Sequence, residues 1–303
     1  MSNKPSKSAA DMSFDMPTVG EVIDHAESRF LETEVFFGHG SLEAYDEAVY
    51  LVLFALGLPP DELDPYLDQI LSEEQFAAIE TLINRRIDER VPAAYLTGEA
   101  WLMGRSFRVD PRVIIPRSFI AELLEEGLSP WVEDPAQVGR LLDMCTGSGC
   151  LAILAAQDFP NAQVDAVDLS TDALAVAVQN VADYELESRV RLHRSDLFAS
   201  LPAARYDVII CNPPYVNADS MNALPPEYHH EPELALAGGT DGMDLIRVLL
   251  RDAPRFMSDT GILVLEIGNE RDFFEKAFPK LEPVWLSTSA GDDQVLLLRR
   301  DQL

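Results

Sequence analysis

Residues 141–152 read Leu141-Leu142-Asp143-Met144-Cys145-Thr146-Gly147-Ser148-Gly149-Cys150-Leu151-Ala152 and indicate a strand, a glycine turn and a helix in succession. Gly147 and Gly149 let the backbone turn tightly and approach a ligand at the N-terminus of the helix. Asp168 follows at the end of the next apolar segment, where its carboxylate can accept both hydroxyls of a ribose. The combination predicts a nucleoside-containing ligand. The spacing Gly147-x-Gly149-x-x-Ala152 also leaves a nicotinamide or flavin dinucleotide open.

Apolar segments alternate with helical segments from residue 116 onward. The alternation is typical of an α/β fold, with one sheet that carries helices on both faces. We expect seven strands in a single domain, at residues 141–144, 164–167, 190–193, 208–211, 262–266, 283–286 and 295–298.

The first third of the chain has a different pattern. Residues 1–16 are polar and aperiodic, and we expect a flexible tail. Residues 17–93 have helical spacing, with a capping box from Ser72 to Gln75, and predict four or five helices that recognise a substrate. Residues 94–115 predict a hairpin linker, because aromatic and β-branched residues stand there among glycines and prolines. Residues 116–303 form the predicted catalytic domain.

Composition excludes several classes of protein. The longest apolar run, residues 48–58, is too short to span a bilayer, which needs about 20 residues, and no signal peptide is evident. Three cysteines argue against a disulfide framework and for a cytoplasmic protein. The net charge of −29 repels phosphate backbones, so we expect no direct nucleic-acid readout. Either a salt-rich cell or a strongly basic partner would account for this charge.

Asn212-Pro213-Pro214-Tyr215 follows the fourth predicted strand. The two prolines fix the backbone and remove two N–H donors. The side-chain oxygen of Asn212 and the carbonyl of Pro213 remain as acceptors for the two N–H groups of a planar amide or base, on which Tyr215 can stack. A conjugated nitrogen is a poor nucleophile, so alignment with an electrophile is the main contribution. The electrophile that this implies is the methyl sulfonium of S-adenosylmethionine. Asp196, after the third strand, stands where an adenine ring could be held.

Together these residues resemble a class I S-adenosylmethionine-dependent methyltransferase, with a Rossmann-like seven-stranded sheet whose last strand is antiparallel. Residues 95–98, 115–117 and 231–242 resemble more narrowly the HemK-like protein glutamine methyltransferases, which methylate a glutamine side-chain amide nitrogen and release S-adenosylhomocysteine. The resemblance implies a small helical N-terminal domain. It also implies acceptor binding by Asn212, Pro213, Pro214, Tyr215, Pro116 and Arg117. The cofactor residues that it implies are Asp143, Thr146, Gly147, Ser148, Gly149, Asp168, Leu169, Asp196, Leu197 and Asn212.

Two branches of that family act on different substrates. Pro116-Arg117-Ser118-Phe119-Ile120-Ala121-Glu122 and residues 228–234 resemble the branch that acts on large-subunit ribosomal protein L-three, although Phe119 stands where that branch has proline. The resemblance implies a basic ribosomal protein as partner, before or during ribosome assembly. The alternatives are a methyltransferase of translation release factors and an amino-group nucleic-acid methyltransferase. A non-catalytic binding module is disfavoured by the intact glycine turn and Asn212.

Other polar residues carry no predicted chemistry. His229 and His230 are set aside as metal ligands, because neighbours on an extended strand point to opposite faces and no third ligand is evident, so no metal is expected. Cys145, Cys150 and Cys211 are interpreted as small apolar fillers. The acidic residues at 11–15 and 125–126 are expected to be solvated.

Overall fold

The computed structural model describes residues 16–41 and 43–303, and they divide into two compact units. The first unit runs through Val35 and then from Ser41 to Glu89, and the second comprises Phe36–Gly40 and Arg90–Leu303. The acidic residues at 11–15, and all but the last residue of the predicted tail, lie outside the described residues. The domain ranges proposed from the sequence stay a prediction. Among the helices that the structure describes, none is long and apolar enough to cross a bilayer.

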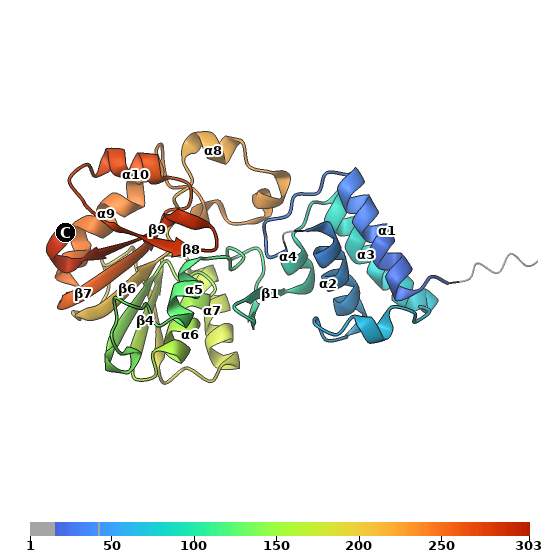
Figure 1. Ribbon diagram of the computed structural model, residues 1–303, viewed down its shortest axis with the longest axis horizontal. Helices are drawn as coiled ribbons and strands as arrows, with labels where there is room; N and C mark the ends of the chain where they lie inside the picture. The colour runs from blue at the N-terminus through green and yellow to red at the C-terminus, as the bar shows by residue number, and fades with distance from the viewer. Residues whose placement is uncertain (1–15, 42) are drawn as a thin grey trace, which may run out of the picture. The chain divides into compact units, whose positions relative to one another are not determined.

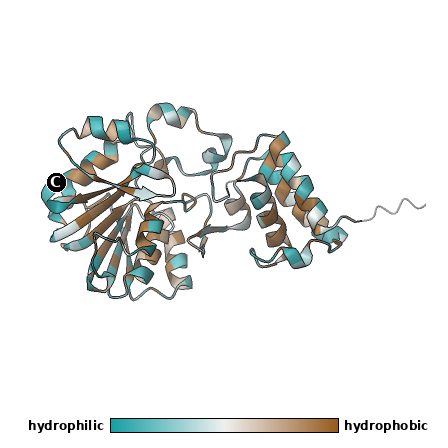
Figure 2. Ribbon diagram, viewed as in Figure 1, coloured by the Kyte–Doolittle hydropathy of each residue, from teal (hydrophilic) through white to brown (hydrophobic). Residues whose placement is uncertain are grey.

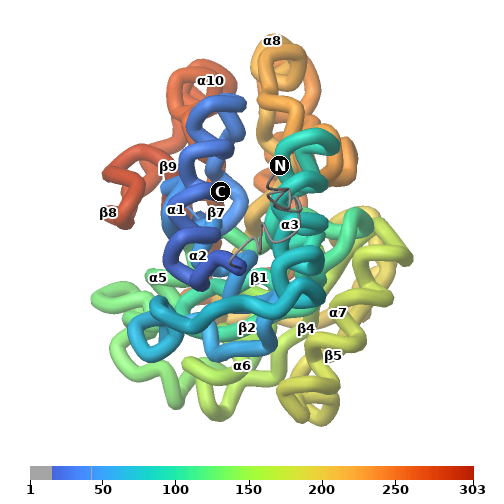
Figure 3. Tube along the Cα trace, turned by 90° about the vertical axis from the view of Figure 1, so that its right-hand side faces the viewer, coloured from blue at the N-terminus to red at the C-terminus, as the bar shows by residue number. Residues whose placement is uncertain are grey.

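The first unit is helical, and Figures 1 and 3 show its three longer helices packed side by side. Ser72 and Gln75 form the predicted capping box, with N–H to side-chain oxygen distances of 3.2 and 3.0 Å. The described residues of the first unit form three α-helices and one 3-10 helix, at the lower end of the expected four or five. Their bounds are α1 (Val19–Glu32), α2 (Ala44–Leu56), η1 (Asp64–Tyr66) and α3 (Glu73–Asp88).

All seven predicted strands are present in one sheet, in the order β5-β4-β3-β6-β7-β9-β8. β9 runs antiparallel to both of its neighbours, as the resemblance implied, and the other pairs are parallel. Pro283 was predicted to begin its strand but lies just before β8. The bounds are β3 (Arg140–Met144), β4 (Gln163–Asp168), β5 (Val190–Arg194), β6 (Tyr206–Cys211), β7 (Met257–Glu266), β8 (Val284–Thr288) and β9 (Gly291–Arg299).

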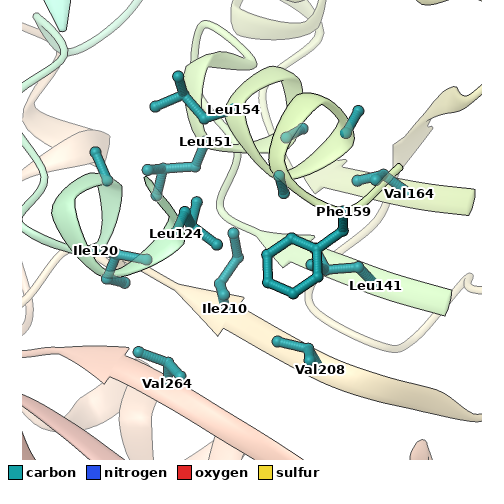
Figure 4. Packing of buried hydrophobic residues seen from close by; sticks show 14 of the residues in the cluster. Ile120, Leu124, Leu141, Leu151, Leu154, Phe159, Val164, Val208, Ile210 and Val264 are labelled. Carbon is teal, nitrogen blue, oxygen red and sulfur yellow. The ribbon is translucent and has the colours of Figure 1, made fainter. Parts of the chain in front are cut away.

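Helices cover both faces of the sheet, and Figure 2 shows hydrophobic residues along the strands between them. One face packs against α5 (Ile120–Glu125), α6 (Cys150–Asp158) and α7 (Thr171–Asp183). Figure 4 shows Leu124 and Phe159 facing Leu141 and Ile210 in that layer. The opposite face packs against α9 (Asp244–Asp252) and α10 (Arg271–Ala277). Burying one such side chain stabilises the fold by about 1.5–3 kcal/mol. The two packed layers therefore hold in place the strand ends that carry the site.

The predicted hairpin is present but shorter than expected. It consists of β1 (Glu99–Leu102) and β2 (Arg105–Arg108), and Tyr95 lies before it in α4 (Ala93–Thr97). Residues 109–116 form no strand. The hairpin belongs to the second unit, where buried Phe107 packs in the core; its role as a linker stays a prediction. The remaining short helices are η2 (Pro135–Gln137), α8 (Ala218–Asn222), η3 (Pro226–His230), η4 (Glu233–Ala235), η5 (Ala253–Arg255) and η6 (Arg300–Gln302).

Candidate active site

A cleft opens at the edge of the sheet where the parallel strands β3, β4 and β6 end, which is where open α/β sheets bind ligands. Four of the predicted residues do not line it: Asp143, Gly149, Pro213 and Tyr215. The predicted residues that line the cleft are Pro116, Arg117, Thr146, Gly147, Ser148, Asp168, Leu169, Asp196, Leu197, Asn212 and Pro214.

The glycine turn after β3 has the backbone conformation that its sequence predicts. Gly147 and Gly149 have φ angles of +56° and +82°, in the left-handed region that favours glycine. A Cβ atom on Gly149 would lie 3.2 Å from the Cβ of Ala177 in α7, so the turn also needs glycine for close packing. The Thr146 N–H donates to the carbonyl of Val167 at 2.8 Å, which fixes the turn against β4.

The side chain of Asp143 stabilises the glycine turn. Its carboxylate is fully buried and accepts a hydrogen bond of 2.5 Å from the hydroxyl of Thr146. Burial raises the pKa of Asp143 to about 7, although the hydrogen bond from Thr146 opposes that shift. Its Oδ1 atom has no hydrogen-bond partner within residues 16–41 and 43–303. Asp143 is fully buried and does not line the cleft, so its contact with a cofactor stays a prediction.

Asp168, at the end of β4, borders the same turn. Its two oxygens accept the N–H groups of Gly147 at 2.9 Å and of Ser170 at 2.8 Å. Burial raises the pKa of Asp168, and these two backbone donors counteract it. A carboxylate oxygen can accept more than one hydrogen bond, so both oxygens keep capacity for hydroxyl donors in the cleft. This geometry fits the predicted ribose contact.

Asp196 and Leu197 reach the cleft from the loop after β5. Leu197 has a φ of +45°, which is unusual for a branched residue, and such strain is often found at functional sites. Leu169 lines the same cleft, and 47% of it is exposed. The two leucines and Asp196 together offer apolar surface and one acceptor, a combination that suits a purine ring with an amino group.

Asn212 follows β6 directly and lines the cleft beside the glycine turn. No residue in the described part of the chain hydrogen-bonds to its side-chain amide, so that group is available to a ligand. The hydroxyl of Tyr215 instead lies 3.5 Å from a carboxylate oxygen of Glu266. The ring of Tyr215 packs on Gly268, where a Cβ atom would come within 2.6 Å of it. Stacking of Tyr215 on an acceptor stays a prediction.

A second segment, residues 231–242, lies against this loop. The Val216 N–H donates to the carbonyl of Leu236 and the Gly238 N–H to the carbonyl of Val216, both at 2.9 Å. A Cβ atom on Gly238 would lie 2.7 Å from the Tyr215 backbone, and one on Gly242 would lie 2.2 Å from the Tyr215 carbonyl oxygen. Only glycine permits this approach, which explains why two glycines are needed in the segment.

Glu231 anchors the start of that segment and was assigned no role from the sequence. Its buried carboxylate binds both terminal nitrogens of Arg117, at 2.6 and 2.7 Å, and accepts the Ile115 N–H at 2.9 Å. His39 Nε2 lies 3.6 Å away. Burial favours the neutral acid, but His39 and Arg117 outweigh it and lower the pKa of Glu231 to about 2. The Arg117–Glu231 ion pair therefore joins residues 115–117 to the start of the 231–242 segment through an ionised carboxylate.

Glu266 is the second residue whose role sequence reasoning missed. It is 2% exposed at the end of β7 and accepts hydrogen bonds from Ser118 and Phe119. The available signal was a lone charge that ends the apolar run 262–266. No comparable local signal marks Glu231, because its partner Arg117 is remote in sequence.

The structure also describes the histidines, cysteines and glutamates to which the sequence assigned no chemistry. His229 and His230 lie in the 3-10 helix η3 and not on an extended strand, so the premise used against a metal site was wrong. Within the described ranges, no group of three or more His, Cys, Asp or Glu side chains could hold a metal ion. Cys150 and Cys211 are buried, as expected of fillers, and burial raises the pKa of the Cys150 thiol to about 12, whereas Cys145 is half-buried and lines the cleft. Glu125 and Glu126 are exposed.

Comparison with known proteins adds two family matches and several relatives. A family model for the methyltransferase small domain matches residues 122–224, and one for the PrmC N-terminal domain matches residues 21–98. Three relatives carry the name ribosomal protein uL3 glutamine methyltransferase. The Bordetella pertussis protein is 63% identical over 95% of this chain and 97% of its own length. The Burkholderia pseudomallei protein is 59% identical over 94% and 95%. A Neisseria meningitidis protein is 53% identical over 95% of each.

Proposed function

This chain belongs to the ribosomal protein uL3 glutamine methyltransferases, and we propose that it transfers a methyl group from S-adenosylmethionine to the side-chain amide nitrogen of a glutamine in uL3. One observation carries the proposal. Asn212, whose amide is held by no described residue, lines the same cleft as the glycine turn and Asp168. A methyl donor bound at the turn and an amide bound at Asn212 would therefore share one cavity.

The cleft residues fit this methyl donor. Asp168 would accept the ribose hydroxyls, Asp196 with Leu169 and Leu197 would hold the adenine, and the left-handed turn at Gly147 and Gly149 leaves room for the amino-acid end. When bound, the sulfonium supplies an activated methyl group and a neutral thioether leaving group.

The protein's own contribution is to align the acceptor. Asn212 Oδ1 and the Pro213 carbonyl would accept the two N–H groups of the glutamine amide, which fixes the plane of the amide and turns its nitrogen toward the methyl donor. Pro213 and Pro214 keep the loop rigid. Since an amide nitrogen is a weak nucleophile, this alignment is the main source of acceleration, and such positioning contributes up to ~7–11 kcal/mol in favourable systems.

The charge of the chain suits a basic protein substrate. Residues 17–93 contain 17 acidic and 4 basic residues, so about a quarter of the chain carries −13 of the net −29. Complementary charge raises the association rate and falls off with salt over the Debye length, ~8 Å at physiological ionic strength. We infer that this helical region attracts uL3 before the protein is buried in a ribosome.

Methyl transfer from labelled S-adenosylmethionine tests the proposal. Purified uL3, release factors and ribosomal RNA are each incubated with the enzyme, and the labelled residue is mapped by mass spectrometry. Label on a glutamine of uL3, lost when that glutamine is changed to alanine, supports the proposal. Label in release factors or in RNA, with none in uL3, would overturn it in favour of the corresponding alternative.

A further inference from the structure

Glu266 occupies a position that an apolar residue would fill at lower cost. It follows the buried run 262–265 of β7, and Leu265 pairs in register with Cys211 of β6. Glu266 therefore lies beside the start of the Asn212–Tyr215 loop at the same sheet edge. Burying a carboxylate is unfavourable unless its oxygens are hydrogen-bonded. The hydrogen-bond partners of Glu266 therefore indicate its role.

Those partners belong to two segments that flank the site, the turn before α5 and the loop after β6. Glu266 Oε2 accepts the hydroxyl of Ser118 at 2.6 Å and the N–H of Phe119 at 3.0 Å. Its Oε1 lies 3.5 Å from the hydroxyl of Tyr215, whose ring is seated on Gly268. Ser118 lines the cleft, and Tyr215 ends the acceptor loop. One carboxylate thus joins the turn before α5 to the loop after β6.

We propose, resting on the function above, that ionised Glu266 is a positioning residue for methyl transfer. It holds the Ser118–Phe119 turn and the hydroxyl of Tyr215 together, and so keeps Asn212 and the acceptor amide aligned with the methyl donor. It touches neither reactant. Loss of its charge releases Tyr215 and slows the transfer step, while the cofactor residues at the glycine turn are left in place.

The charged groups around Glu266 indicate how its ionisation would be measured. Burial raises the pKa of Glu266 to about 7, against hydrogen bonds from Ser118 and Phe119 and the charge of Arg117. Burial also lifts the pKa values of Tyr215 and Cys211 far above neutrality, so neither changes charge in this range. β9 presents apolar Val295 in register with Glu266.

One further carboxyl group, Asp143, bears on that measurement, and a second, Glu270, lies after β7. After β7, Glu270 Oε1 accepts the side-chain N–H of Asn217 at 2.8 Å. Asp143 also has a pKa raised by burial to about 7, so the wild-type profile alone does not identify the titrating group. Neither the acceptor amide nor a sulfonium titrates near neutrality. A change in kcat between pH 6 and pH 8 therefore reports a protein group, and a Glu266 variant assigns it.

The test is kcat for methyl transfer to uL3 between pH 5.5 and 8.5, in wild type and in Glu266→Gln. The amide keeps the shape and can still accept from Phe119. We expect kcat of wild type to fall as pH drops below about 7. In Glu266→Gln we expect kcat to be about tenfold lower at pH 8 and nearly independent of pH. The affinity for S-adenosylhomocysteine, measured by calorimetry, should stay within about twofold.

Two variants distinguish a positioning role of Glu266 from a general contribution to the stability of the fold. Asp165→Asn is the matched control, because Asp165 is a buried carboxylate of β4 with partners in His193, Arg140 and Tyr206, away from the cleft. It should lower the melting temperature but leave the pH profile unchanged. Tyr215→Phe combined with Glu266→Gln should cost no more activity than the more severe single variant, because both act through one contact.

The outcomes separate this proposal from the proposed function. No label on uL3 with wild-type enzyme contradicts the function itself. If wild type labels uL3 and Glu266→Gln keeps both its rate and the fall of kcat in acid, the positioning role of Glu266 is wrong. If Asp165→Asn flattens the profile equally, general loss of stability explains the effect and the proposal also fails.

Discussion

Replacing Glu231 by glutamine should destabilise the second unit by about 3 kcal/mol at pH 7. The carboxylate is buried and binds Arg117 through two hydrogen bonds of 2.6 and 2.7 Å. Its pKa of about 2 lies 2.5 units below its ordinary value of 4.5. At ~1.4 kcal/mol per unit, this difference corresponds to about 3 kcal/mol of stability in the ionised form. Breaking a buried ion pair from one side costs about 3–5 kcal/mol, which agrees.

The pH dependence gives the same prediction a second readout. Because the folded-state pKa of Glu231 is depressed, its contribution is complete above about pH 5 and is lost as the pH falls toward 2. The difference between wild type and Glu231→Gln should therefore shrink by about 1 kcal/mol between pH 7 and pH 4. Urea unfolding at the two pH values measures it. At pH 7 the melting temperature should fall by about 6–12 °C for a unit of this size.

A neighbouring carboxylate provides the control for Glu231. Glu233→Gln removes an exposed charge two residues away and should change stability by less than about 0.5 kcal/mol. The double variant Arg117→Gln/Glu231→Gln should lose less than the sum of the single variants, because each single change leaves a charged partner unpaired. A Glu231→Gln protein within about 1 kcal/mol of wild type, or a difference that does not shrink in acid, would refute the ion-pair reasoning.

Three more expectations concern the cleft and the partner. Asp168→Ala should weaken S-adenosylhomocysteine binding by roughly 1–3 kcal/mol in calorimetry, and tighter binding of NADH than of S-adenosylhomocysteine by wild type would overturn the nucleoside assignment. Asn212→Ala should lower kcat/KM by the equivalent of ~2–4 kcal/mol with nearly unchanged cofactor affinity, and a near wild-type rate would make Asn212 a turn residue only. The association rate with uL3 should fall about tenfold between 50 and 500 mM salt in stopped-flow measurements, and a salt-independent rate would contradict electrostatic attraction by residues 17–93.

The local sequence was enough to identify the elements of the catalytic unit. Strand positions followed from short apolar runs, because a strand buried on both faces needs apolar side chains at successive positions. The turn followed from Gly147 and Gly149, since left-handed backbone favours glycine, and both have positive φ. The capping box at Ser72 was equally local and is confirmed. Each of these features depends on residues only a few positions apart.

Local sequence was less informative at the borders between elements. Tyr95 was placed in a hairpin and lies in α4, because its aromatic side chain is common in strands but tolerated in a helix. His229 and His230 were interpreted as extended and lie in a 3-10 helix that begins at Pro226. Short segments have few residues over which a periodicity can be seen, so packing decides their conformation.

The sequence by itself determined the strand–turn–helix that begins at β3, the rigid acceptor loop at Asn212 and the acidic balance of the chain. Only the tertiary structure decided which carboxylates join the segments around that loop. Glu231 reaches Arg117 across 114 positions, and Glu266 reaches Ser118 across 148. These contacts exist because the strand order places β7 beside β6 and returns distant loops to one sheet edge. No local pattern encodes such an encounter, since a hydrogen bond depends on where its partners meet and not on their separation along the chain.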